Sequence, residues 1–228
     1  AERLRSTAVE PREVANAMDA LGRLRCRHED LLAGVAEFVP AKIDRFQPQD
    51  IVGVAVAFGR LRERDEATFI TLSTRLCQEL RCFSYAQLTS IATAYARLEV
   101  REVRFLHRLL DHCSTVAARS TVAPREAVAL LSAWGRLQLA HADAFETLGN
   151  VLLDAFEGAD DVKGGRLSLN DWSQVAVAFA RSHWAYRPLL ALIGDVCTQA
   201  PQPVPLADAG SILCAFCRLQ WQHVPLQR

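Results

Sequence analysis

Six arginines recur along the chain inside one short pattern, and arginine is the side chain best suited to hold a phosphate group. The pattern is Ala, a large apolar residue, a small residue, Arg and usually Leu. A planar guanidinium donates paired hydrogen bonds to phosphate oxygens and stacks on unpaired bases. One arginine per repeat on one helix face could therefore follow an RNA backbone. The candidate RNA-binding residues are Arg23, Arg60, Arg97, Arg136, Arg181 and Arg218.

The same arginines also have a structural interpretation. Each would fall near the C-terminus of a helix, where a cation compensates the partial negative charge of the last carbonyls. Each could equally pair with an acidic residue of the next repeat. The two interpretations are compatible, because an arginine that caps a helix can still present a face to RNA.

Cysteine and histidine offer no comparable pattern. Cys214 and Cys217 have a Cys-x-x-Cys spacing, but a zinc site needs two more ligands and none is evident. We expect both to be buried as small apolar residues of a helix. His107 and His112 are five positions apart and do not share a helix face. With no nucleophile–base arrangement, Gly-rich phosphate loop or metal motif, we expect no metal, no cofactor, no small-molecule substrate and no enzymatic activity.

The alanines that open the six patterns lie 37, 37, 39, 45 and 37 residues apart, which indicates an internal repeat. Apolar residues precede each alanine at helical spacing and predict an amphipathic helix. In the second repeat they are Ile51, Val54, Ala55, Phe58 and Leu61.

Two further sets of residues belong to this first helix. Small residues such as Gly53, Ala57 and Ala94 would let neighbouring helices approach closely. An aromatic series lies in the middle of the apolar stripe and is expected to be core, not a set of stacking platforms. Its members are Phe58, Tyr95, Trp134, Phe179 and Phe216.

Helix start signals precede each apolar stripe. Pro11, Pro48 and Pro124 suit the first helical turn, where no N–H donor is needed. Two residues later stands an acidic or amide residue, which suits the positive end of the helix dipole. Two of these starts predict capping boxes, formed by Ser84 with Gln87 and by Ser168 with Asp171.

A second helix follows each first helix after a short polar turn. Its apolar positions also keep register, as at Leu32, Phe69, Leu106, Phe145 and Leu190. A hairpin of two such helices buries its apolar face only when neighbours stack on it. The sequence therefore predicts an all-α fold, a solenoid of about six helix-turn-helix repeats of about 37 residues.

The predicted solenoid is a single domain over residues 10–228, preceded by an N-terminal extension over 1–9. We expect an exposed loop near 157–165 and a rigid connector over 200–205. The repeats are predicted at 10–46, 47–83, 84–122, 123–167, 168–204 and 205–228, the last one incomplete.

Charge and hydropathy restrict the function further. The chain has 26 basic and 26 acidic residues, and only Lys42 and Lys163 are lysines. Zero net charge counts against strong autonomous nucleic-acid binding and fits a subunit held by many partners better. The arginine bias can also reflect a GC-rich genome. No apolar run is long enough to span a bilayer, so no membrane contact is expected.

The period and the Pro-x-acidic start, followed by Ala-aromatic-small-Arg-Leu, resemble the heptatricopeptide and octotricopeptide repeats of organellar RNA-associated proteins. These include the families with a RAP domain and the FAST-kinase-like families. The resemblance covers roughly residues 10 to 225, without a visible RAP domain. The repeat pattern is also similar to that of the repeat proteins of the mitochondrial ribosome in apicomplexan-type parasites.

The resemblance implies a mitochondrial location, with another organelle as the alternative. It implies a structural component of the mitochondrial ribosome that contacts rRNA and neighbouring proteins. The alternative function is a protein–protein scaffold in another complex, without RNA contact. Exposed arginines would favour RNA, and arginines neutralised by Asp or Glu would favour the scaffold.

Overall fold

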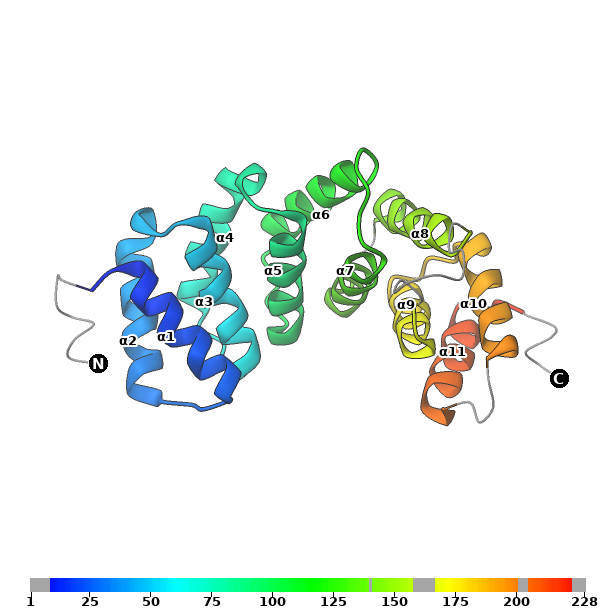
Figure 1. The fold of residues 1–228 in the computed structure, drawn as a ribbon, viewed down its shortest axis with the longest axis horizontal. Coiled ribbons are helices and arrows are strands. Elements are labelled where there is room, and N and C mark those ends of the chain that lie inside the picture. Colours follow the sequence, from blue (N-terminus) through cyan, green and yellow to red (C-terminus); the bar gives the residue numbers. More distant parts are fainter. Residues whose placement is uncertain (1–8, 140, 158–166, 201–204, 223–228) are drawn as a thin grey trace. The chain divides into compact units, whose positions relative to one another are not determined.

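The computed structural model describes residues 9–139, 141–157, 167–200 and 205–222. Within these ranges the chain forms eleven α-helices and no strand (Figure 1). Successive helices pack as hairpins, which confirms the predicted all-α solenoid. The predicted extension over 1–9, loop near 157–165 and connector over 200–205 lie wholly or mostly outside the described residues.

The first helix of each repeat is called an A helix below, and the second a B helix. The A helices are α1 (Pro11–Leu24), α3 (Pro48–Leu61), α5 (Tyr85–Leu98), α7 (Pro124–Leu137), α9 (Leu169–Arg181) and α11 (Leu206–Arg218). The B helices are α2 (Glu29–Lys42), α4 (Glu66–Glu79), α6 (Val103–Ala117), α8 (Ala142–Glu157) and α10 (Arg187–Gln199). Short 3-10 turns follow α2 at Ile43–Arg45 and α4 at Leu80–Cys82.

The A helices begin where the sequence predicts. Proline is the first residue of α1, α3 and α7. Both expected capping boxes are present. At α5, the Ser84 N–H donates to Gln87 Oε1 at 2.8 Å, and the Gln87 N–H donates to Ser84 Oγ at 3.3 Å. Ser168 and Asp171 exchange the equivalent bonds at α9. These bonds satisfy amide groups that a helix start otherwise leaves unpaired.

The A helices end in a left-handed residue that is not glycine. In four of them it directly follows the last leucine, at Arg25, Arg62, Glu99 and Gln138, with φ between 51° and 55°. The next N–H then bonds back to a carbonyl inside the helix, as Glu63 N–H does to the Phe58 carbonyl at 3.1 Å. This turn sends the chain back along the B helix.

The chain divides into two compact units, 1–112 and 113–228, and the boundary falls within α6. In the first unit, α1 packs on α3 and α3 on α5, while α2 packs on α4. In the second unit, α7 packs on α9 and α9 on α11, while α8 packs on α10. Each unit is thus a layer of A helices backed by a layer of B helices. The single domain over 10–228 stays a prediction.

Small residues set the distance between neighbouring A helices. A Cβ atom placed on Gly59 would lie 3.0 Å from the Ala94 Cα, and one on Gly135 only 2.6 Å from the Ala178 Cα. A side chain on Gly135 would force its neighbour to move, and one on Gly59 would be tighter than almost all real Cβ contacts. The close approach expected from the small residues is therefore present in both units.

The aromatic series forms the core, as predicted. Phe58, Tyr95, Trp134 and Phe179 are fully buried, and Phe216 is 3% exposed. In the first unit the rings of Phe58, Phe69 and Tyr95 form edge-to-face contacts, with centroids 6.0 and 5.0 Å apart. They alternate between A and B helices, so they join the two layers. The buried Tyr95 hydroxyl shares a 2.9 Å hydrogen bond with Ser73 Oγ.

Candidate nucleic-acid interface

Each A helix turns one stripe of side chains away from the core. The stripe consists of its second, sixth, ninth and thirteenth residues, called the A stripe below. In α1 these are Arg12, Asn16, Asp19 and Arg23, all exposed or half-buried. The spacing of four, three and four residues keeps them on one helix face. The A stripe is therefore the accessible surface of the A layer in each unit.

All six predicted arginines occupy the thirteenth position of this stripe. Each lies in the last turn of its A helix, and each is exposed. The helix-end location expected from the structural interpretation is thus present. The exposure expected for RNA contact is present as well. Whether each arginine forms an ion pair within the chain therefore decides between the structural and the RNA-binding interpretation.

In the first unit, one carboxylate serves two of the arginines. Asp19 accepts from Arg23 Nε at 2.7 Å and from Arg60 Nη1 at 2.9 Å. The first contact lies within α1, and the second joins α1 to α3. Arg97, at the same position of α5, forms no ion pair with the described residues.

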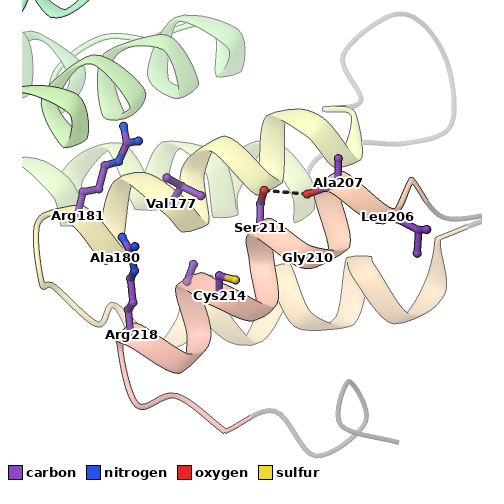
Figure 2. A pocket seen from close by; sticks show the side chains of 10 residues that line it. Val177, Ala180, Arg181, Leu206, Ala207, Gly210, Ser211, Cys214 and Arg218 are labelled. Atoms are coloured by element: carbon purple, nitrogen blue, oxygen red, sulfur yellow. Dashed lines mark hydrogen bonds between the residues drawn. The ribbon is translucent and has the colours of Figure 1, made fainter.

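In the second unit, none of the three arginines has an acidic partner among the described residues. Arg181 of α9 and Arg218 of α11 line one hollow of about 450 Å³ (Figure 2). Its walls include Val177, Ala180 and Gly210. The guanidinium groups of the two arginines extend in the same direction in this view. Two unpaired cations beside an apolar surface can hold a phosphate and the ring of its nucleotide.

Cys214 and Cys217 of α11 are exposed, so the prediction that they are buried is wrong. Cys214 is the ninth residue of α11 and belongs to the A stripe, which is not buried in any A helix. The position of Cys217, by contrast, is packed in the other A helices. The residues equivalent to Cys217 are Gly22, Gly59, Ala96, Gly135 and Ala180, all buried. There the next A helix covers this position, whereas no described helix packs beyond α11. The position in the helix is the same, and the difference at Cys217 is that no described helix covers it.

A second hollow, of about 370 Å³, crosses α1, α3 and α5 in the first unit. Arg12, Asn16 and Gln49 line it with polar side chains, and Val56 and Gly53 contribute an apolar part. It lies on the same A stripe as the arginines, and it includes the Asp19–Arg60 pair.

Comparison with protein families places the chain among RNA-associated proteins. The family model described as RNA-editing substrate-binding complex 6 protein matches residues 5–153, which is more than half of the chain. The chain belongs to the RNA-editing substrate-binding complex 6 family. No curated protein matches it. The heptatricopeptide or RAP type suggested by the repeats stays a prediction.

The match to the RNA-editing substrate-binding complex 6 family covers only part of the A stripe. Arg23, Arg60, Arg97 and Arg136 lie inside the matched residues, together with the hollow across α1, α3 and α5. Arg181, Arg218 and the hollow between α9 and α11 follow the matched residues. The same repeat pattern thus extends beyond the part of the chain that the family model describes.

The sequence analysis missed the polar members of the A stripe, chiefly Arg12, Asn16 and Gln49. Their signal was available, because the stripe is the polar complement of the apolar stripe in the same register.

In the described ranges, no group of three or more His, Cys, Asp or Glu residues could hold a metal ion. No described helix is long and apolar enough to cross a membrane.

Proposed function

We propose that this chain is an RNA-contacting structural subunit of a mitochondrial ribonucleoprotein, and that the arginines of its A helices bind the RNA backbone. The observation that carries this proposal is the state of Arg97, Arg136, Arg181 and Arg218. All four are exposed, and none has an acidic partner in the described part of the chain. The family match supports an RNA-associated role, because the description of the family names a complex that binds RNA-editing substrates.

The mechanism is electrostatic and geometric. Each guanidinium that meets a phosphate releases condensed counterions, so affinity falls as salt rises. The close packing of A helices fixes the spacing of these cations within each unit. The zero net charge limits attraction at long range, which fits a subunit whose partners supply part of its affinity. No step of this role needs catalysis, and we propose that the chain is not an enzyme.

The RNA partner follows from the repeat resemblance. We propose rRNA of the mitochondrial ribosome, with neighbouring ribosomal proteins on the remaining surfaces. A second candidate is a complex that handles RNA-editing substrates, and the family match over residues 5–153 favours it. Both candidates use the same A stripe and differ in the RNA that is bound.

The protein-only scaffold is the competing function. It would need acidic groups on a partner to meet the four unpaired arginines. The pairing of Arg23 and Arg60 with Asp19 shows how this chain neutralises an arginine when it does so internally. The other four lack such a group, which favours an RNA ligand.

Salt-dependent RNA binding tests the proposal. Arg97, Arg136, Arg181 and Arg218 are changed together to Ala, and binding to a labelled single-stranded RNA is followed by fluorescence anisotropy across a salt series. Four lost contacts should reduce the slope of log K against log salt by up to about 3, at roughly 0.7 per phosphate of a single strand.

A matched control changes four exposed arginines outside the A helices, Arg104, Arg108, Arg119 and Arg187. The charge change is the same, so the control should keep most of the wild-type slope. Equal losses in both variants would reject the A stripe as the binding surface. If the wild-type chain bound no RNA and co-purified with a protein complex free of RNA, the result would reject RNA binding and support the protein-only scaffold.

Crosslinking and sequencing of RNA bound to the native protein, beside a sucrose-gradient profile, separates the two assemblies. Mitochondrial rRNA and migration with ribosomal particles would support the ribosome. Messenger RNA substrates of editing, in a particle free of ribosomal subunits, would support the second candidate instead.

A further inference from the structure

The hollow across α1, α3 and α5 is lined by side-chain amides that form no hydrogen bond with any described residue. Asn16 and Gln49 are exposed, and neither has a hydrogen-bond partner in the described part of the first unit. Two of the other polar lining groups are already engaged. Gln87 Oε1 accepts from the Ser84 N–H, and the Ser90 hydroxyl donates to the Ala86 carbonyl at 2.9 Å.

The charges around these amides are nearly balanced. Asp50 Oδ2 accepts from the Gln47 N–H at 3.1 Å, so it caps its own helix. Asp19 is paired with Arg60 and Arg23. Arg12 is the remaining cation of the lining, and it forms no ion pair with the described residues. The hollow therefore offers one unpaired cation and two unpaired amides.

An apolar surface lies beside the amides. Val52, Val56 and Ala15 line it, and Gly53 leaves its centre open. A Cβ atom on Gly53 would meet only Ala15, at 3.6 Å or more. Apart from Ala15, no side chain of another helix lies within 4 Å of this position. The apolar surface beside Gly53 therefore has room for a flat ring, in the same hollow that Asn16 and Gln49 line.

The hollow between α9 and α11 has a different chemistry. Arg181 and Arg218 are unpaired there, and the rest of the lining is apolar apart from Ser211 and Cys214 (Figure 2). The Ser211 hydroxyl already donates to the Ala207 carbonyl at 2.8 Å. No amide lines that hollow. It can hold a nucleotide by phosphate and ring face, but it has little with which to tell one base from another.

We propose that the hollow across α1, α3 and α5 recognises the edge of a nucleobase, with adenine preferred, in single-stranded RNA. A carboxamide presents one donor and one acceptor side by side, and adenine presents the complementary pair at its N6 amino group and N7. Arg12 would hold the adjoining phosphate. This inference rests on the proposed RNA-binding function and adds base selectivity to it.

Homopolymer binding tests the inference with the full chain. Oligo(A), oligo(U) and oligo(C) of roughly twelve nucleotides, a length that spans one binding site, are compared by anisotropy at one salt concentration. The wild-type chain should bind oligo(A) about fivefold more tightly or better, the lower end of what a bidentate amide contact provides. The double variant Asn16→Ala with Gln49→Ala should bind oligo(A) as weakly as the wild-type chain binds oligo(U).

Two controls isolate the amides from charge and folding. Changing Gln78 and Gln199 to Ala removes two exposed amides from B helices and should leave the preference intact. Changing Arg181 and Arg218 to Ala should weaken all three oligomers by the same factor. All these side chains are exposed and alanine favours helix, so the variants should keep the wild-type thermal midpoint.

The outcomes distinguish this inference from the function on which it rests. Equal binding of the three oligomers, a preference for another base, or an adenine preference that survives loss of Asn16 and Gln49 would overturn base recognition while RNA binding stands. Failure of every oligomer to bind would overturn the proposed function and the inference together.

Discussion

The carboxylate of Asp19 and the guanidinium of Arg60 lie 2.9 Å apart, although 41 positions separate the two residues in the chain. Asp19 also binds Arg23, so it neutralises two of the six candidate arginines with one charge. Asp19 and Arg60 are each about one third exposed. Surface pairs of this kind contribute little to stability, which makes their effect on RNA the more informative property.

Replacing Asp19 by Asn should increase affinity for RNA. The change frees Arg23 and Arg60, and the slope of log K against log salt should steepen by up to about 1.4, the contribution of two phosphate contacts on a single strand. The free energy of unfolding should fall by less than about 1 kcal/mol. Anisotropy titrations with labelled RNA across a salt series give the slope.

Asp154→Asn provides the control for this change. Asp154 is an exposed residue of α8, a B helix, and its replacement alters net charge by the same amount. If both variants raise RNA affinity equally, general charge is responsible and the pairing of Asp19 has no special role.

Gly135→Ala should destabilise the fold, although alanine is the better helix former. The added Cβ would lie 2.6 Å from the Ala178 Cα, so α7 and α9 would have to separate. We expect a loss of about 1–3 kcal/mol, typical of overpacking. Gly210→Ala in α11 meets nothing within 4 Å and should gain about 0.5–1 kcal/mol. Denaturant unfolding of both variants measures the difference, and a stabilised Gly135→Ala would contradict the close helix contact.

Tyr95→Phe should cost about 1–2 kcal/mol of stability, because it leaves the buried Ser73 hydroxyl without its partner. Ser73→Ala should cost a similar amount. The double variant should cost less than the sum, because both changes remove one hydrogen bond. Additive losses in urea unfolding would show that the two hydroxyls act independently.

Tyr95 should also make the fold sensitive to alkali. Burial raises the pKa of Tyr95 above its usual value of 10.0. The tyrosine therefore loses its proton at lower pH in the unfolded state than in the folded state. The contribution of Tyr95 to stability is fully present below pH 10, and stability falls as pH rises beyond 10. The decline due to this group approaches about 1.4 kcal/mol per pH unit once the unfolded tyrosine is fully ionised. Tyr95→Phe should show a shallower decline between pH 10 and 11 than the wild-type chain, and equal slopes would exclude this source of sensitivity.

The cysteines should differ widely in reactivity. Cys214 and Cys217 are exposed on α11, and a short pulse of N-ethylmaleimide at neutral pH should label both. Cys113 is buried, and burial raises the pKa of its thiol to about 12, so it should remain unlabelled until the protein unfolds. Mass spectrometry of the digested protein reads each site. Protection of Cys214 and Cys217 would mean that another element covers this face of α11.

Much of the fold was predictable because its determinants are local. Proline, the capping boxes and the apolar stripe act within one or two helical turns, so they placed the A helices and the buried Phe58, Tyr95, Trp134, Phe179 and Phe216. The same register predicted that the six arginines would share one position at the end of a helix. Such patterns depend on a period of 3.6 residues and need no knowledge of neighbouring repeats.

The sequence by itself therefore determined the all-α repeat, its core and the row of candidate cations. Tertiary structure alone decided which of those cations are neutralised, since Asp19 reaches Arg60 only when α1 packs on α3. It also exposed Cys217, because burial at that position requires a neighbouring helix and no described helix packs there on α11. The two hollows likewise form between helices whose equivalent positions lie 37 or more residues apart in the chain. Their chemistry results from contacts that no local pattern encodes.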